Sequence, residues 1–461
     1  MQDPADFRFL NRLSSRLGKP VDLAALALFR AFLGGLCLYG TLLFYFSGTV
    51  EALWLVPEFR FKYFGFEWVG AFPDLILRGL WLGLCIAFAG IMLGAFYRFC
   101  AIYAFVVVAY FFLLDQAPFL NQYYLLLWVL FWMAMIPAHG MFSLDAMFRA
   151  SVRRAFVPSW MVVMLCFSMA CVYFFGGVAK INADWLHGEP MTSWLTGKVG
   201  ESFFTTGLAT GDVAWFFSYA GLIFDLLVVP LLIWRRTRIF GFILSLVFHV
   251  GNSVLFSLGP GGLGTVSLGF FPWISIALTG LFFPTDWPRK IFRKWAGSRN
   301  DEGAASTSIG NAPVVLLVIA VGLQLLLPLR PFFYPGNASW TDDGHRFAWR
   351  MKLRWKTGTT RYFVRENRQE ELEKVYPDAF ITDYQESMLL GRPDMILQLA
   401  HHIGKERMSG GATAVEVYAR SKIALNGRTP QDFIDRRVDL MTVKRSLGPT
   451  TWLLPLKEEQ R

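Results

Sequence analysis

Long apolar runs alternate with short polar connections over the first two thirds of the chain. A helix needs about 20 mostly apolar residues to cross a bilayer. Nine segments meet or approach that length, and they cover residues 23–46, 75–96, 99–115, 122–141, 159–179, 214–234, 239–258, 262–283 and 313–329. The pattern therefore predicts a polytopic α-helical membrane protein with about nine spanning helices.

After residue 330 the pattern is that of a small soluble domain. Residues 346–356 alternate strictly, which predicts a strand with one basic face formed by Arg350, Lys352, Arg354 and Lys356. Thr357-Gly358-Thr359 is typical of a turn, so we expect a hairpin with residues 361–365. Helical spacing near 366–375 and 392–406, and alternation over 413–420, complete an expected α+β domain.

Composition supports this division of the chain. Only 17% of the residues are charged and 54% are hydrophobic, whereas a soluble protein has about 25% charged residues. Residues 330–461 hold 39 of the 78 charged side chains. A single uniform soluble fold is therefore excluded. The five cysteines all lie in apolar stretches, so no zinc or disulfide pattern is present.

The basic residues of the short connections predict the orientation, because cytoplasmic loops are enriched in Lys and Arg. One set of connections holds sixteen cations, and the other holds four, which are Arg60, Lys62, Lys180 and Lys198. This places the N-terminus in the cytoplasm and the C-terminal domain outside it. The net charge of +10 then reflects membrane topology and does not indicate a nucleic-acid partner.

These patterns divide the chain into five parts. We expect a cytoplasmic N-terminus (1–22), a helical membrane domain with the active site (23–295), a cytoplasmic linker (296–312), a last transmembrane helix (313–329) and an extracytoplasmic α+β domain (330–461). Residues 143–156 have an apolar and a basic face, which predicts a helix lying in the cytoplasmic interface.

Ionisable residues within apolar segments are candidates for function because burying them in a bilayer is costly. Asp225 can serve as a structural hydrogen-bond acceptor or as a proton carrier. Lys180 ends an apolar helix at the outer interface, beside aromatic residues and a glycine pair. Removal from water favours a neutral amine that can act as a base. The alternative is an interfacial lysine that only reaches out to the water.

The segment from Tyr173 to Trp185, YFFGGVAKINADW, resembles the region around the catalytic lysine of vitamin K-dependent gamma-glutamyl carboxylases and their bacterial homologues, whose membrane domain is of the HTTM type. Other matches occur in the family's order over nearly the whole chain. They are Leu28-Phe29-Arg30, Tyr97-Arg98, Asn121 with Tyr124, Asp225, Phe248-His249 with Asn252-Ser253, the segment 286–290, Asn337 to Thr341 with Trp349, and Arg437-Val438-Asp439.

The resemblance implies an enzyme of the carbon–carbon lyase and monooxygenase type. In the family, a neutral lysine takes a proton from reduced vitamin K, a naphthohydroquinone, and oxygen then converts the quinone to its epoxide. The strong base formed in that step removes a proton from a glutamate of a protein or peptide, and carbon dioxide adds there. No metal takes part. The implied partners are a lipid quinone, membrane lipids and a glutamate-containing protein.

Residue roles follow from the matched motifs. Lys180 would be the initiating base, with Asn121 and Gln122 as further catalytic residues. His249, Asn252, Tyr124 and Trp185 would bind the quinone, and Arg350, Lys352, Arg354 and Lys356 would bind the acidic substrate. Those four cations can equally form a solvated strand face or contact anionic headgroups.

Two departures from the family's pattern leave alternative functions open. Gln122 stands where the carboxylases have a histidine, and glutamine cannot carry a proton at neutral pH. The animal enzyme also has a longer C-terminal region. A quinone epoxidase or quinone-binding protein without carboxylation is the first alternative, and a transporter or lipid-binding protein on the same scaffold is the second. We expect a bacterial inner membrane with a periplasmic C-terminal domain, or the endoplasmic reticulum membrane in a eukaryote.

Overall fold

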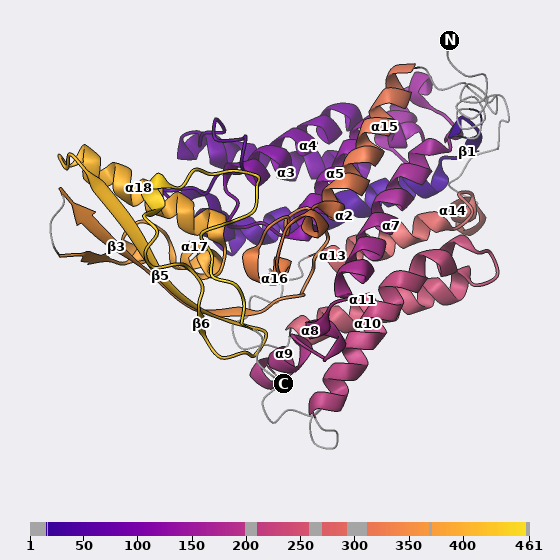
Figure 1. Ribbon diagram of the computed structural model, residues 1–461. Helices are drawn as coiled ribbons and strands as arrows, with labels where there is room; N and C mark the ends of the chain where they lie inside the picture. The colour runs from indigo at the N-terminus through magenta and orange to yellow at the C-terminus, as the bar shows by residue number, and fades with distance from the viewer. Residues whose placement is uncertain are drawn as a thin grey trace, which may run out of the picture.

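The computed structural model describes residues 15, 17–198, 210–257, 270–292, 311–367 and 371–457. A helical bundle carries a mixed α+β domain at one of its ends (Figure 1). Six described helices are long and apolar enough to cross a bilayer: α2 (Ala24–Phe46), α3 (Asp74–Leu93), α4 (Tyr97–Leu114), α7 (Trp160–Lys180), α10 (Thr210–Ile233) and α15 (Asn311–Leu326), which continues into η5 (Leu327–Phe333). The prediction of a multi-pass helical membrane protein is confirmed.

Three further apolar helices lie where the other spans were predicted. They are α5 (Asn121–Met135), α11 (Arg238–Ser257) and α13 (Phe271–Thr279). Helix α5 ends early because Pro137 disfavours helical geometry at the residue before it. Short elements join the long helices: η1 (Glu51–Leu55), η2 (Ala138–Gly140), α6 (Leu144–Phe148), η3 (Ala150–Val152), α8 (Ala183–Leu186), α9 (Met191–Lys198), η4 (Gly280–Phe282) and α14 (Trp287–Ile291).

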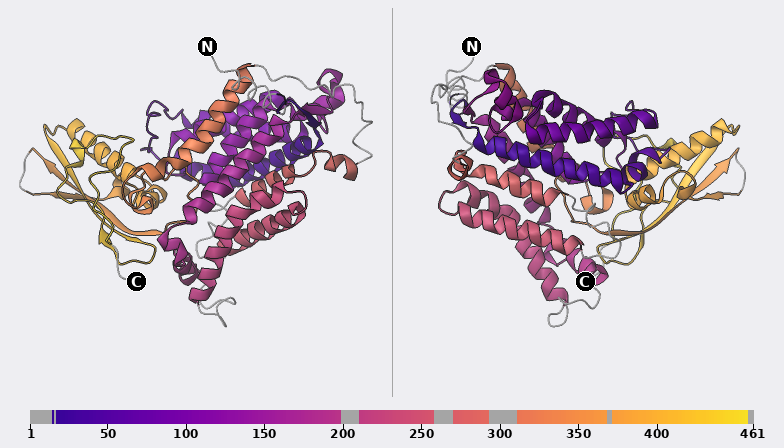
Figure 2. Two further views of the ribbon diagram at one scale, coloured as in Figure 1. Left: turned by 45° about the vertical axis from the view of Figure 1, so that its right-hand side comes forward. Right: turned by 180° about the vertical axis from the view of Figure 1, so that it is seen from behind.

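Three basic connections meet at the end of the bundle that lies away from the α+β domain (Figure 2). Strand β1 (Pro20–Asp22) pairs with β2 (Phe156–Pro158), and Arg289 Nε donates to Asp22 Oδ2 over 2.6 Å. The helix predicted over 143–156 is wrong as one element, because α6 and η3 divide it. Most of the predicted linker 296–312 lies outside the described residues.

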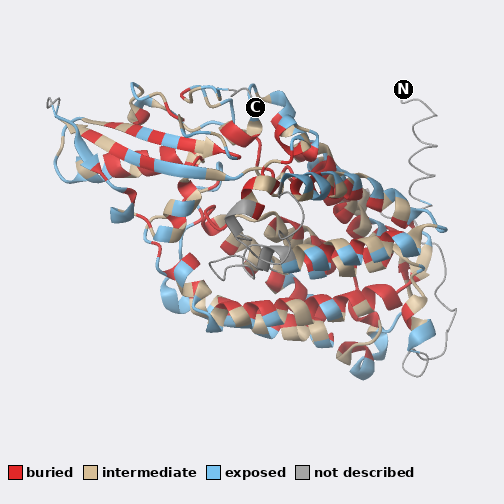
Figure 3. Cartoon of the chain, turned by 90° about the horizontal axis from the view of Figure 1, so that it is seen from below, coloured by how far each residue is buried: buried red, intermediate tan, exposed pale blue. Residues whose placement is uncertain are grey.

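The C-terminal domain has a four-stranded antiparallel sheet in the order β4-β3-β5-β6, which confirms the predicted α+β class. Helix α18 packs its apolar face on the sheet, and buried and exposed residues alternate along the strands (Figure 3). The elements are α16 (Ala338–Thr341), β3 (Lys356–Glu366), β4 (Glu373–Val375), η6 (Pro377–Ala379), α17 (Asp383–Leu389), α18 (Pro393–Ser409), β5 (Val415–Leu425), β6 (Gln431–Asp432) and η7 (Leu440–Thr442).

Some of the strands and helices predicted within this domain are confirmed, and others are wrong. The helix near 392–406 and the strand near 413–420 are confirmed as α18 and β5. The strand over 346–356 is wrong, because the backbone has positive φ at Phe347, Trp349 and Lys352 and β3 begins only at Lys356. The hairpin is also wrong, since Thr357 to Thr359 lie inside β3 and pair with β5. Glu373 to Val375 form β4, not the helix expected near 366–375.

Two outer connections of the bundle hold the C-terminal domain. The backbone N–H of Lys62, before α3, donates to Gln398 Oε1 over 2.7 Å. Gln385 Nε2 donates to Asp115 Oδ2, just after α4, over 2.8 Å. Because α17 and α18 supply these glutamines, the domain is anchored through the same helices that cover its sheet.

Because Asp115 is buried, we expect the stability of this contact to depend on pH. Burial raises the pKa of the Asp115 carboxyl to about 6, although hydrogen bonds from Ala117 and Gln385 oppose the rise. A raised pKa stabilises the fold below the unfolded value of about 3.9, and that stability is lost as the pH rises through about 6. Between pH 4 and pH 7.5, we expect the free energy of unfolding of the wild type to fall by about 2–3 kcal/mol more than that of Asp115→Asn.

Melting in detergent at several pH values measures this effect. Asp378→Asn, which removes an exposed carboxylate of the C-terminal domain, serves as the control. Parallel pH profiles for the wild type and Asp115→Asn would contradict the assignment.

Candidate active site

Lys180 is the last residue of α7, and its amine lies inside the protein. The residue is only 7% exposed. Its Nζ forms an ion pair with Oδ2 of Asp225 on α10 and lies 3.5 Å from the carbonyl oxygen of Gly176. Among the described residues, Asp225 is the carboxylate that pairs with this amine. This placement argues against a lysine that only reaches the interfacial water.

Glycines allow α7 and α10 to approach closely enough for the pair to form. A Cβ added at Gly176 would lie 3.0 Å from Asp225 Oδ2, and one at Gly177 would lie 2.7 Å from the Leu226 side chain. On α10, a Cβ at Gly221 would contact the Lys180 side chain at 3.8 Å. Small residues commonly permit such contacts between membrane helices. The glycine pair before Lys180 therefore has a packing function.

Trp185 and Ser218 form a wall beside the amine. The indole ring of Trp185 has its centroid 5.3 Å from Lys180 Nζ, and Trp185 Nε1 donates to the carbonyl oxygen of Ser218 over 2.7 Å. The Ser218 hydroxyl is buried and has no hydrogen-bond partner among the described residues. A polar group buried without a partner is costly, so this hydroxyl is a candidate ligand contact.

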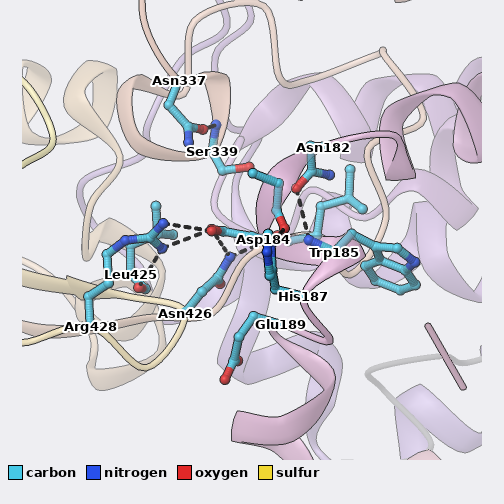
Figure 4. Close-up of polar contacts among 12 residues, drawn as sticks. Asn182, Asp184, Trp185, His187, Glu189, Asn337, Ser339, Leu425, Asn426 and Arg428 are labelled. Carbon is cyan, nitrogen blue, oxygen red and sulfur yellow. Dashed lines mark hydrogen bonds and ion pairs between the residues drawn. The ribbon is translucent and has the colours of Figure 1, made fainter. Parts of the chain in front are cut away.

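The turn after Lys180 is fixed to the C-terminal domain through Asp184 (Figure 4). Arg428 Nη2 donates to Asp184 Oδ1 over 2.6 Å, and Arg428 Nη1 donates to Oδ2 over 2.9 Å. Asn426 Nδ2 adds a bond of 2.8 Å to Oδ2. Asn182 Oδ1 accepts from the backbone N–H of Trp185 and caps α8. These bonds hold Trp185 in place beside Lys180.

A segment of the C-terminal domain enters the helical bundle near this site. Trp349 is fully buried, and its ring lies 4.8 Å from that of Tyr124 on α5. A Cβ at Gly176 would be 3.8 Å from both the Trp349 carbonyl oxygen and Met351 Cε. The segment thus packs between α5 and α7, one turn from Lys180.

The four cations of the predicted strand do not share one solvated face. Arg350 Nη2 donates to Ser339 Oγ over 3.2 Å, and Arg354 forms an ion pair with Asp342. Lys352 Nζ lies 5.7 Å from the centroid of the Trp194 ring. Lys356 Nζ donates to the carbonyl oxygens of Trp340 and Gly391, at 2.5 Å each. Three of the four are therefore tied into the interior of the domain.

This region is a buried cluster with an excess of positive charge. We call it the Asp342 cluster; it consists of Asp342, His345, Arg346, Arg350, Arg354, Lys356 and Arg392. Burial would raise the pKa of Asp342, but the charges of Arg354 and Arg346 hold it well below its ordinary value.

Burial and the charge of Arg354 lower the pKa of Arg350 to about 10 and that of Lys356 well below its ordinary value. Arg346 Nη2, Arg350 Nε and His345 Nδ1 are buried without a partner among the described residues. Asp342 and, beside Lys356, Asp343 thus face six basic groups, and unsatisfied nitrogens remain. Such a cluster is suited to an anion.

The three candidates at the start of α5 point in different directions. Tyr124 faces Trp349, and its hydroxyl is buried without a described partner. Asn121 Oδ1 is likewise buried and without a described partner. Gln122 instead lines an aromatic chamber of about 110 Å³ between α2, α3, α4, α5 and α13. Gln122 is therefore not brought next to Lys180.

His249 approaches the site through Tyr173. Its Nε2 lies 2.7 Å from the Tyr173 hydroxyl, and Tyr173 shares a helical face with Gly177 and Lys180. Phe271, which lines the aromatic chamber, is 5.9 Å from the His249 ring. Asn252 is half-buried one turn further along α11. His249 is thus linked to both α7 and the chamber.

Two family models match the chain. The model described as "HTTM domain" matches residues 18–287, and the model described as "Vitamin K-dependent gamma-carboxylase, lumenal domain" matches residues 310–459. The chain belongs to the vitamin K-dependent gamma-carboxylase family. No solved structure matches it. Membership suggests a carboxylase-like enzyme in a multi-pass membrane protein with a C-terminal lumenal-type domain.

The side chains around Lys180 match the chemical groups of the family's vitamin K. A naphthoquinone is flat and apolar with two polar oxygens, and the site offers the Trp185 ring, the Ser218 hydroxyl and the Lys180 amine. The chamber, lined largely by Phe, Trp and Tyr, fits an apolar tail. Among the residues that the structure describes, no group of three His, Cys, Asp or Glu side chains could hold a metal ion.

Sequence reasoning missed three residues of this site. Ser218, Tyr173 and Met351 approach Lys180 or its neighbours only through the fold. Tyr173 had a local signal, since it lies seven residues before Lys180 on one helical face. Ser218 also lies seven residues before Asp225 on α10. Met351 had no such signal.

Proposed function

We propose that this protein carries out the family's vitamin K-dependent oxygenation coupled to glutamate carboxylation, with Lys180 as the initiating base. The observation that carries the proposal is the buried Lys180–Asp225 pair beneath the C-terminal domain. A base in this position is shielded from water and lies where a lipid quinone partitions.

Lys180 and Asp225 can exchange protons with each other and need no other charged side chain to do so. At rest, the amine and the carboxylate hold one proton between them. When Nζ takes a second proton from a quinol hydroxyl, Lys180 is an ammonium and Asp225 holds the first proton as a carboxylic acid. The two groups are in contact, so this exchange of protons needs no further side chain.

Reduced vitamin K, when bound, supplies the acidic hydroxyl and the carbon centre that reacts with dioxygen. Trp185, Ser218, Asn121 and Tyr124 would orient its ring. His249 and Asn252 would line the path toward the chamber, and the chamber would take the apolar tail. The C-terminal domain covers the site, so bulk water has little access to the amine.

The Asp342 cluster would bind the glutamate side chain. Its excess charge and the unpartnered nitrogens of Arg346, Arg350 and His345 support this role. Arg354 would act by keeping the cluster positive, Lys356 would act through its bonds to the Trp340 and Gly391 carbonyl oxygens, and Lys352 would contribute at the margin of the cluster. Carbon dioxide would meet the substrate there, in the periplasm or in the lumen, with the N-terminus cytoplasmic.

An assay with purified protein tests the proposal. Protein in detergent given reduced vitamin K and oxygen is expected to form vitamin K epoxide and to fix labelled carbon dioxide into a glutamate peptide. Epoxide without fixed label would support an epoxidase without carboxylation, which Gln122 favours. No turnover of any quinol would refute the proposal.

Replacing Gln122 with histidine tests the role of this departure. Histidine titrates near neutral pH and can pass a proton, whereas glutamine cannot. If the wild type forms epoxide with little fixed label, Gln122→His is expected to raise label per epoxide by about tenfold or more. The matched control is Gln431→His, which changes an equally half-buried glutamine on β6, in the C-terminal domain. Equal effects of both substitutions would contradict the idea.

A further inference from the structure

The sheet of the C-terminal domain has one covered and one open face. Helix α18 packs on buried residues such as Tyr362, Val364 and Val417. Neighbouring residues along each strand point to the opposite side. Figure 2 shows the sheet standing out beyond the end of the bundle. Its second face is therefore free of the helices that cover the first.

Cations dominate this open face. Arg361, Arg420 and Lys422 are exposed on β3 and β5, and Lys374 is exposed on β4. In the described residues none of these four forms an ion pair. On the same face Glu416 pairs with Arg365 at 2.8 Å, and Asp432 lies opposite Lys422 but pairs with Arg436 at 2.7 Å. Asp383 and Glu386 of α17 line a hollow together with Arg361, but neither forms an ion pair with it. Four cations thus lack a carboxylate partner.

The register places two of these cations directly opposite each other. Arg361 pairs with Arg420 across β3 and β5. Like charges in this position destabilise a sheet. Phe363 and Tyr376 hold two of the cations in place, since Arg420 Cζ lies 4.2 Å from the Phe363 ring centroid and Lys374 Nζ lies 4.2 Å from that of Tyr376. The two arginines repel each other, and aromatic contacts fix the positions of the cations. Binding of an anion from outside would relieve this repulsion.

We propose that this basic sheet face, formed by Arg361, Lys374, Arg420 and Lys422, binds an acidic, extended segment of a protein partner. Arg420 and Lys422 lie two residues apart on β5, which is also the interval at which side chains recur on one side of an extended polypeptide. The binding goes beyond the proposed reaction, because an acidic segment would be held here whether or not the protein carboxylates it. This face is separate from the Asp342 cluster, in which Arg350, Lys356 and Arg392 are buried.

Peptide binding to the full-length protein in detergent tests the proposal. The probe is a fluorescein-labelled peptide of six Glu-Ser repeats, with six Lys-Ser repeats as the reversed-charge probe. We expect the acidic peptide alone to bind, more weakly as salt rises from 50 to 300 mM. Arg361→Glu/Arg420→Glu should weaken binding by about tenfold or more.

Two controls make the result decisive. Lys405→Glu/Lys444→Glu makes the same change in net charge at two exposed lysines outside the basic sheet face and should bind like the wild type. Lys180→Ala should also bind normally, so failure of the reaction and failure of docking are distinguishable. Equal losses in both double variants, or no binding by the wild type, would overturn the proposal. So would binding to phosphatidylserine vesicles with none to the peptide.

Discussion

Replacing Lys180 with alanine is expected to lower the rate of epoxide formation by about a thousandfold. The amine is the group placed to accept the quinol proton, and general base catalysis contributes about 10²–10⁴-fold to a rate. Within the described site, Asp225 is the nearest alternative acceptor, and a carboxylate is a far weaker base than an amine. The measurement is epoxide formed per minute from reduced vitamin K and oxygen.

Lys290→Ala is the matched control for this loss. Lys290 is an exposed lysine on α14 that pairs with Asp286 at the other end of the bundle. We expect its substitution to leave the rate within about twofold of the wild type. A Lys180→Ala protein that melts normally and still forms epoxide at the wild-type rate would remove Lys180 from the mechanism.

Removing both members of the buried pair is expected to separate stability from activity. Lys180→Met leaves the Asp225 carboxylate buried without its partner, and breaking a buried pair in this way costs about 3–5 kcal/mol. Lys180→Met/Asp225→Leu removes both charges, and such replacements are often neutral. We therefore expect the double variant to melt near the wild type, well above the single variant, while both remain inactive.

Melting curves and epoxide assays on the same preparations measure the two effects. A stable double variant without activity would show that the pair is needed for chemistry and not only for folding. If the double variant instead recovered activity together with stability, the pair would be structural.

The apolar runs and the local motif were enough to locate the long apolar helices and to single out Lys180. Helix α7 and strand β5 lie where apolar runs and alternation predicted them. The glycines before Lys180 were visible in the sequence, but their purpose was not. Their purpose depends on α10, which brings Asp225 beside Lys180 from 45 residues away along the chain and packs it against Gly176.

The basic strand was the main error, and its cause is physical. Residues 346–356 alternate as a strand does, yet positive φ at Phe347, Trp349 and Lys352 turns the chain into the bundle. Asp342 stabilises Arg354 in the interior through an ion pair that no local periodicity signals. A basic face does exist on the sheet, but it is formed by β3, β4 and β5 together. Register across strands cannot be read from one segment.

The central claim is that the Lys180 amine accepts the quinol proton, and chemical rescue tests it most directly. Lys180→Ala removes the amine and leaves space for a small primary amine beside Asp225. Methylamine and more weakly basic analogues would be added to this variant with reduced vitamin K and oxygen. The account predicts that epoxide formation rises with the concentration of unprotonated amine and is faster for the more basic amines. If the variant binds quinone but no amine restores any epoxide, the assignment of Lys180 as the base is contradicted.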